Sequence, residues 1–296
     1  MGNTSGGETG QGINGILSVK NKLAGPFGSV LRLMFGFAFL GRRVMTMLKI
    51  ENKSKHQHGS GGFGIDILWP GMMQNSDDSG IGAIGRIDHA NVKAGTVISM
   101  HPHKDDEILT YMRKGKMLHL DTVGNEEEIS DARLMLMNAG HTFQHEERIL
   151  GEKGESMQCL QIFIRPSETD LAPQVQFHDF GTPYSDNNWR LIAGPESAPL
   201  TFRSQTWVQD ARLAEGGELT LPAVPVSNVV RLLYVFEGEA RIGETALNKG
   251  ESIIIEDDDV YTITALETTD LVLFTTDPAA KYFRGGMFSG NMRPRL

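Results

Sequence analysis

The sequence predicts an all-β fold of two tandem β-barrels, and three observations support the prediction. From about Phe63 onward, short runs rich in Val, Ile, Leu, Thr, Phe and Tyr alternate with Gly, Asp, Asn and Pro, as expected for short strands joined by turns. No long stretch repeats its apolar residues with the period of a helix. The chain also contains a weak internal repeat, so one barrel is expected to occur twice.

The internal repeat rests on two similar tyrosine-containing segments. Leu109–Lys116 resembles Leu232–Glu239, and each places a tyrosine four residues before a glycine that begins a turn. Each copy continues through a polar segment and a second strand, then ends in an apolar strand that reaches a proline. Residues 179–199 are rich in Gly, Pro and Asn, which is typical of a linker. We therefore expect domains at residues 56–178 and 179–296.

Residues 1–55 are expected to form an N-terminal extension that is partly disordered, because its first residues are largely Gly, Ser, Thr and Asn. Residues 30–40 form an apolar run that is too short to span a bilayer, which takes about 20 residues. For residues 20–50 three interpretations remain open: a helix that contacts a membrane surface or directs targeting, a helix docked on the body, or sequence upstream of a native start at Met45 or Met47.

The composition is that of an ordinary globular protein. The chain has 296 residues, 40% of them hydrophobic and 22% charged, a length that suggests about two domains. Its formal net charge is −9, and an acidic body argues against direct nucleic-acid binding, which needs a basic face. The single cysteine, Cys159, excludes an intrachain disulfide and favours a reducing compartment, so we expect a cytoplasmic protein. Cys159 stands in an apolar run, where we expect a core strand residue rather than a nucleophile.

The histidines predict one metal site. All nine lie at or before His178, so only the first domain can hold an imidazole-based site. In a strand, residues two apart point to the same face, so His101 and His103 can bind one divalent metal together. His145 and Glu147 repeat this spacing further along the chain. If the two pairs lie on neighbouring strands, four ligands converge.

This donor set predicts the kind of metal without fixing its identity. Three imidazole nitrogens and one carboxylate oxygen suit iron(II), and manganese, nickel, copper and zinc also fit. Four protein ligands leave open positions on an octahedral metal, and an oxygen-activating or Lewis-acid site requires such positions. We therefore expect one divalent metal ion in the first domain and none in the second.

The residues around these ligands match a known pattern. The first cupin signature is present nearly in full, at Gly95, His101, His103, Glu107 and Gly115. The chain resembles the pirin family, bicupins with two jelly-roll-type cupin barrels of which the first binds iron. The likeness covers about residues 60–290. The matching stretches are His101–Ile108, His119–Gly124, Asn138–Gly140 and His145–Glu147, with a pirin-like end at Phe288–Asn291.

The resemblance implies a function as well as a fold. The metal ligands that it implies are His101, His103, His145 and Glu147, with iron(II) as the metal. The implied activity is that of an iron-dependent dioxygenase similar to quercetin 2,3-dioxygenase, which acts with O₂ on a flavonol or a similar small enolic substrate. Glu147 or Glu107 would accept the proton of the substrate hydroxyl. The alternative is a non-enzymatic, redox-sensing regulator whose iron state changes its affinity for a partner protein.

The chain departs from the family pattern at Lys104-Asp105-Asp106, where pirins typically carry Arg-Gly-Phe. The change adds acidity beside the metal and removes an aromatic ring, so we expect a substrate pocket of altered shape. Three other candidates are expected to be structural: His119 at a strand end, the solvated linker His56-Gln57-His58, and the acidic turn Glu126-Glu127-Glu128.

Overall fold

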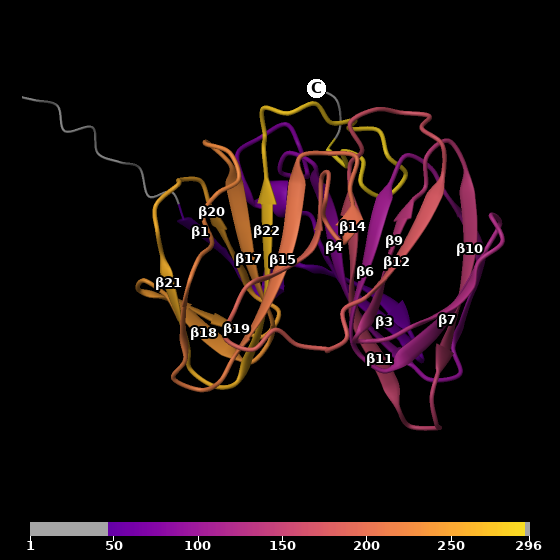
Figure 1. Ribbon diagram of the computed structural model, residues 1–296, viewed down its shortest axis with the longest axis horizontal. Helices are drawn as coiled ribbons and strands as arrows, with labels where there is room; N and C mark the ends of the chain where they lie inside the picture. The colour runs from indigo at the N-terminus through magenta and orange to yellow at the C-terminus, as the bar shows by residue number, and fades with distance from the viewer. Residues whose placement is uncertain (1–46, 294–296) are drawn as a thin grey trace, which may run out of the picture. The chain divides into compact units, whose positions relative to one another are not determined.

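The computed structural model describes residues 47–293, and these residues form two β-barrels (Figure 1). The strands of the first barrel are β2 (His56–Ser60), β3 (Phe63–Leu68), β4 (Ile84–Lys93), β5 (Val97–His103), β6 (Glu107–Lys114), β7 (Lys116–Asp121), β8 (Glu126–Ile129), β9 (Arg133–Asn138), β10 (Phe143–Leu150), β11 (Ser156–Ile164) and β12 (Gln174–Asp179). They form a seven-stranded sheet in the order β12-β9-β6-β11-β4-β3-β2 and a four-stranded sheet in the order β5-β10-β7-β8.

The second barrel repeats this arrangement. Its strands are β1 (Met47–Ile50), β13 (Arg190–Gly194), β14 (Leu200–Thr201), β15 (Thr206–Leu213), β16 (Glu218–Thr220), β17 (Val230–Glu237), β18 (Glu239–Ile242), β19 (Thr245–Asn248), β20 (Ser252–Ile255), β21 (Thr262–Ala265) and β22 (Thr269–Thr276). Its sheets have the orders β1-β20-β17-β22-β15-β13-β14 and β16-β21-β18-β19. The described helices are two short 3₁₀ turns, η1 (Asn52–Ser54) and η2 (Pro70–Met73). The all-β, two-barrel prediction is confirmed.

Two segments before residue 61 form strands. Met47–Ile50, which the sequence analysis assigned to the extension, pairs antiparallel with β20 and so belongs to the second barrel. His56–Ser60, expected as a solvated linker, is exposed but pairs with β3. The domain boundaries at residues 56 and 179 remain a proposal, to which we add β1 as part of the second domain.

The interpretations of the N-terminal extension concern residues that the structure does not describe. The predicted disorder and the three readings of the apolar run fall mainly on residues 1–46, which lie outside the described residues. Between residues 47 and 293, no helix has the length and apolar character needed to cross a membrane.

The two faces of the seven-stranded sheet of the first barrel contact different parts of the molecule. Along β6, Ile108 faces the barrel interior, whereas Leu109 and Tyr111 face the second barrel, because successive strand residues point to opposite sides. One hydrophobic cluster therefore joins the two barrels, since it contains Leu109 together with Leu232 and Phe274 of the second barrel. The two barrels thus share a core, and the metal-site candidates lie on the opposite face of the sheet.

Candidate metal centre

Strands β5 and β10 bring the three candidate histidines together. His101 and His103 lie two apart on β5, and the antiparallel register places His145 of β10 directly opposite His101. One ring nitrogen from each of the three histidines lies within 4.8 Å of the others. The Nε2 atoms of His103 and His145 are 3.1 Å apart. The two pairs thus lie on neighbouring strands, and the three histidines converge.

The geometry of the three rings fits a shared metal ion. Two nitrogens that bind one ion at 2.0–2.1 Å and at right angles lie about 3 Å apart, which is close to the His103–His145 separation. The Nδ1 atom of His101 lies 2.9 Å from the carbonyl oxygen of Ser99. If Nδ1 carries the ring proton and donates a hydrogen bond to that carbonyl, the Nε2 lone pair is free for a metal.

The protonation state of the rings also suits a metal. His103 and His145 are almost wholly buried, and their Nδ1 atoms have no hydrogen-bond partner among the described residues. Burial, together with the neighbouring imidazoles, lowers the pKa of His145 to about 2. Burial likewise lowers the pKa of His101. Neutral imidazole is the form that binds metals, so the residues present fit a divalent ion.

Glu147 lies beside the histidine group rather than within it. Its carboxylate is buried, and its Oε1 atom lies 3.7 Å from Nδ1 of His145. The same oxygen accepts a hydrogen bond of 3.0 Å from Nε2 of Gln161. Burial raises the pKa of Glu147 to about 7. The β5–β10 register shifts between His145 and Glu147, and such a bulge re-aims nearby side chains.

The three histidines and Glu147 line one cavity of about 240 Å³ inside the first barrel. Its apolar wall includes Ile98, Ile108, Met157 and Phe163. Its polar groups include Gln161 and an ion pair in which Arg86 donates two hydrogen bonds, of 2.7 and 2.5 Å, to Asp88. A largely apolar cavity with few converging polar groups is the usual form of a small-molecule site.

Comparisons with known proteins show which proteins this chain resembles. The family model described as Pirin matches residues 73–164. A pirin-like protein from Caulobacter vibrioides is 31% identical over 178 residues, which are 58% of this chain and 74% of that protein. The chain belongs to the pirin family. A second pirin relative, the quercetin 2,3-dioxygenase of Escherichia coli K12, is 25% identical over 203 residues, 67% of this chain and 84% of that protein.

Solved structures of pirins have the same fold. The structure of YhhW from Escherichia coli has a TM-score of 0.69 and 20% identity, and the match covers 80% of this chain and all of that chain. YhhW has also been solved in complex with nickel(II), and that structure matches with a TM-score of 0.68 and 21% identity over 79% of this chain and all of that chain. A more distant cupin, the oxalate decarboxylase of Lactobacillus farciminis, matches with a TM-score of 0.53 and 12% identity over 80% of this chain and 88% of that chain.

In this pirin, Glu107 is not brought to the histidines. Its carboxylate accepts hydrogen bonds from Nδ2 of Asn138 at 2.8 Å and from the backbone N–H of Arg203 at 2.7 Å. Glu107 precedes Ile108 on β6, so its side chain leaves the sheet on the face toward the second barrel. Burial there raises its pKa to about 7. The structure thus separates Glu107 from the cavity that Glu147 lines.

The departure from the pirin pattern at Lys104–Asp106 lies behind the site rather than in the cavity. Lys104 is exposed and pairs with Asp170, while the Asp105 carboxylate accepts hydrogen bonds from Thr169 and from the Asp170 backbone. The Asp106 carboxylate lies 3.7 Å from Nδ1 of His103, on the side away from the other histidines' Nε2 atoms. The added acidity is therefore adjacent to His103, but it does not line the cavity.

His119 is placed as a supporting residue. Its ring is fully buried, and Nε2 lies 2.9 Å from Oδ2 of Asp121. The ring stacks against Phe143 at 6.3 Å and lies 5.4 Å from the ring of His145. Because Nε2 contacts Asp121 of the same strand, His119 packs beside the three converging histidines and is not one of them.

Sequence reasoning missed several cavity residues. Arg86 and Asp88 were not singled out, although opposite charges two residues apart share one face of a strand and are a usable signal. His58 lines the cavity although it was assigned to a linker. Phe288 also lines the cavity, and its only sequence signal was the pirin-like end.

Proposed function

We propose that this pirin is an iron-dependent dioxygenase that acts with O₂ on a flavonol or a similar small enolic substrate. The proposed metal ligands are His101, His103, His145 and Glu147. The observation that carries the proposal is the convergence of three imidazoles in a largely apolar cavity. The similarity to the quercetin 2,3-dioxygenase of Escherichia coli supports the reaction class.

Iron(II) bound at this site would supply the redox chemistry of oxygen and polarise a coordinated substrate oxygen. The chain's own residues have separate tasks. Glu147, which is buried beside His145 and lines the cavity, would accept the hydroxyl proton of an enolic substrate. Gln161 donates a hydrogen bond to that carboxylate and holds it in place.

The remainder of the cavity binds and orients the substrate. Ile108, Met157 and Phe163 form an apolar lining, so a bound substrate would displace water and strengthen the electrostatic interactions inside. The Arg86–Asp88 ion pair offers a donor and an acceptor to a polar group at the other end of the substrate. Glu107 has no task in this scheme, because its carboxylate bonds to Asn138 and the Arg203 backbone instead.

Elemental analysis combined with an oxygen-uptake screen tests the proposal. Purified protein should contain about one metal ion per chain, and the iron(II)-loaded form should consume oxygen with at least one flavonol, catechol or enediol. Loading with manganese, nickel, copper or zinc identifies the metal that supports turnover. Absence of oxygen uptake across the whole panel with fully iron-loaded protein would contradict the dioxygenase proposal. The redox-regulator alternative stays a prediction, since residues 47–293 offer no observation that favours it.

A further inference from the structure

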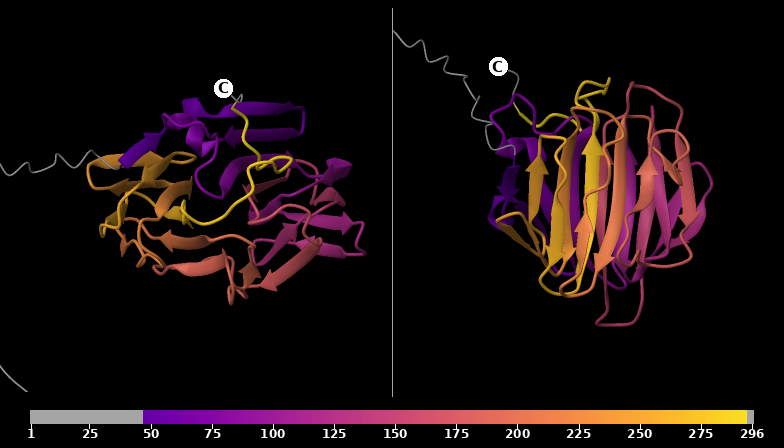
Figure 2. Two further views of the ribbon diagram at one scale, coloured as in Figure 1. Left: turned by 90° about the horizontal axis from the view of Figure 1, so that it is seen from above. Right: turned by 60° about the vertical axis from the view of Figure 1, so that its left-hand side comes forward.

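The C-terminal segment after β22, residues 282–293, packs on the first barrel, and we refer to it as the C-terminal strap. In Figures 1 and 2 this yellow segment leaves β22 and crosses to the strands of the first barrel. The backbone N–H of Phe283 donates to the carbonyl of Pro166 at 2.8 Å, and that of Met287 donates to the carbonyl of Lys104 at 3.0 Å. The second half of the chain thus returns to the barrel that holds the candidate metal site.

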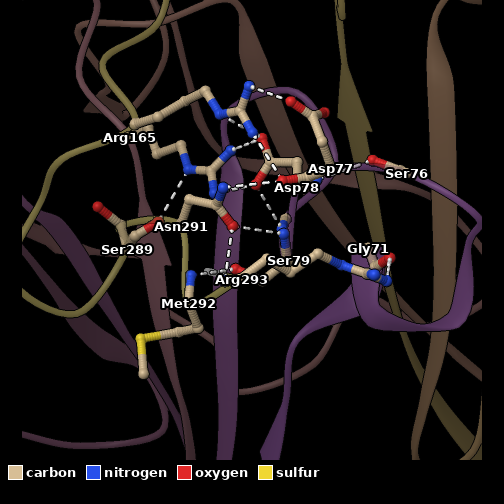
Figure 3. A network of polar contacts seen from close by, with 12 residues as sticks. Gly71, Ser76, Asp77, Asp78, Ser79, Arg165, Ser289, Asn291, Met292 and Arg293 are labelled. Carbon is tan, nitrogen blue, oxygen red and sulfur yellow. Dashed lines mark hydrogen bonds and ion pairs between the residues drawn. The ribbon is translucent and has the colours of Figure 1, made fainter. Parts of the chain in front are cut away.

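One end of the strap is fixed by a buried arginine (Figure 3). The guanidinium of Arg165 is fully buried and donates to both carboxylate oxygens of Asp78 at 2.7 Å. It also donates to the carbonyl oxygen of Ser289 in the strap at 2.8 Å. Asn291 continues the contact, because its Oδ1 accepts the backbone N–H of Ser79 at 3.0 Å. Bidentate arginine–carboxylate pairs are rigid, so this anchor holds the strap in one position.

A second anchor connects the strap to a candidate metal ligand. Oδ1 of Asp106 accepts hydrogen bonds from Oγ and the backbone N–H of Ser289, at 2.7 and 2.8 Å. Oδ2 accepts the backbone N–H of Phe288 at 3.0 Å and lies 3.7 Å from Nδ1 of His103. Asp106 is buried. One carboxylate therefore contacts both the strap and the rear of the His103 ring.

The strap supplies one wall of the cavity through Phe288. The centroid of its ring lies 5.0 Å from that of His103 and 5.5 Å from that of Phe163. The guanidinium of Arg86 lies over the same ring, 5.4 Å from its centroid. Phe288 is therefore in contact with the metal-site end of the cavity and with the polar pair that faces the substrate.

We propose that Phe288 is a specificity-determining residue that restricts the substrate to compact, one-ring or acyclic enediols, and that Asp106 is the residue that positions it. This inference rests on the proposed function only in taking the cavity as the substrate site. The cavity of about 240 Å³ is smaller than the roughly 300 to 1,000 Å³ typical of sites for drug-sized ligands. The size of the cavity and the position of Phe288 in its wall therefore favour a compact substrate over a three-ring flavonol.

Ligand binding to nickel-loaded protein tests the size limit without turnover. The dissociation constants of catechol and quercetin are measured by optical titration for wild type, Phe288→Ala and the control Met287→Ala, whose side chain lies in the strap but is half exposed. Wild type should prefer catechol, and Phe288→Ala should shift the ratio toward quercetin by about tenfold or more, with one nickel per chain retained. Met287→Ala should match wild type.

Two results would overturn the size limit. One is a preference of wild type for quercetin, and the other is an unchanged ratio in a Phe288→Ala protein that keeps its nickel. Neither result depends on oxygen consumption, so failure of the dioxygenase proposal and failure of this inference are distinguishable.

The positioning role of Asp106 has its own measurement. Asp106→Asn should raise hydrogen exchange across residues 283–292 and shift the binding ratio in the same direction as Phe288→Ala, because the charged acceptor of three strap hydrogen bonds is lost. Ser289→Ala removes only the hydroxyl contact and should change hydrogen exchange and the binding ratio less than Asp106→Asn does. If Asp106→Asn does not fold, Ser289→Ala tests the positioning role in its place. The positioning role would be refuted if folded variants kept the hydrogen exchange of wild type across residues 283–292 and its ratio of catechol to quercetin binding.

Discussion

At the scale of single residues, the candidate site depends on side chains whose ordinary ionisation is changed by burial. His145 stays neutral because its ring is buried next to two other imidazoles. Glu147 and Glu107 both have a pKa raised to about 7, also because of burial. Their surroundings nevertheless differ, since Glu147 lines the cavity and Glu107 contacts Asn138 at the interface between the barrels. Equal shifts in pKa therefore do not indicate equal functions.

Replacing His145 by alanine should remove the metal. Its Nε2 atom lies 3.1 Å from that of His103, so the variant loses one of the converging nitrogens, and metal content should fall from about one ion per chain to near zero. The fold should persist, because loss of one buried ring typically costs about 1–3 kcal/mol. Elemental analysis and circular dichroism measure both effects. His141→Ala, at an exposed position, is the matched control. Full metal content in the His101→Ala/His145→Ala double variant would refute the site.

Glu107 should make the metal-free protein less stable as pH rises. Its pKa is about 7 in the folded protein and about 4.5 when unfolded, so the folded state holds the proton more tightly. Its favourable contribution is complete below about pH 4.5 and is lost as pH rises to about 7, a change on the order of 3 kcal/mol. The free energy of unfolding of chelator-treated protein is measured by denaturant titration at pH 5.0 and 7.5. It should decline less between these two pH values in Glu107→Gln than in wild type. Glu126→Gln, on the surface, should keep the wild-type decline. If the free energy of unfolding fell equally with pH in wild type and in Glu107→Gln, the raised pKa of Glu107 would be contradicted.

At the scale of the elements, the turn between β9 and β10 positions the strand that carries His145. Gly140 in this turn has φ of 55°, and a Cβ atom there would lie 2.1 Å from the carbonyl oxygen of Leu171. Its own carbonyl accepts the backbone N–H of Asp105 at 2.8 Å. The turn thus connects the segment after His103 with the start of β10, and only glycine fits it without displacement of the backbone.

Gly140→Ala should destabilise the protein by about 2 kcal/mol or more, since backbone strain is added to a steric clash. It should also weaken metal binding, because the start of β10 must shift. Chemical denaturation and metal titration against a competing chelator measure the two effects. Gly61→Ala is the matched control, since Gly61 has φ of 63° but open space around a Cβ atom; it should cost about 1–2 kcal/mol and leave metal affinity unchanged. Equal losses of stability and of metal affinity in the two variants would show that the contact with Leu171 is unimportant.

At the scale of the whole described chain, the two barrels are joined by a buried ionic cluster as well as by apolar packing. Asp210 of β15 accepts hydrogen bonds from the hydroxyl of Tyr111 at 2.9 Å and from Arg190 at 2.8 and 3.0 Å. It also pairs with Arg113 of β6. Asp210, Tyr111 and Arg113 are almost wholly buried. The face of the seven-stranded sheet opposite the cavity is therefore specifically complementary to the second barrel.

Asp210→Asn should be strongly destabilising. The variant leaves the buried guanidinium of Arg113 without its carboxylate partner, and breaking a buried pair in this way typically costs about 3–5 kcal/mol. The free energy of unfolding from denaturant titration measures the loss. Glu168→Gln is the control, because the Glu168–Lys281 pair is exposed and surface pairs contribute little. Comparable stability of the two variants would mean that the buried cluster does not hold the barrels together.

The all-β class, the duplicated barrel and the spacing of the histidine pairs could be predicted from the sequence. These features are local, because strand period and turn residues fix which side chains share a face. The His101 and His103 pair needed only that rule, and the absence of histidine after His178 confined the imidazole site to the first barrel.

The tertiary structure decided what local rules leave open. Strand alternation places Glu107 and Ile108 on opposite faces of the sheet. Only the packing of the second barrel shows that the face with Glu107 forms the interface between the barrels. Phe288 and Asp106 are 182 residues apart in the chain and yet hydrogen bonded. Such a contact depends on how the chain returns after β22, and the spacing of residues along a sequence carries no information about that path. The grouping of the three histidines could therefore be predicted from the sequence, whereas the shape of the cavity around them could not.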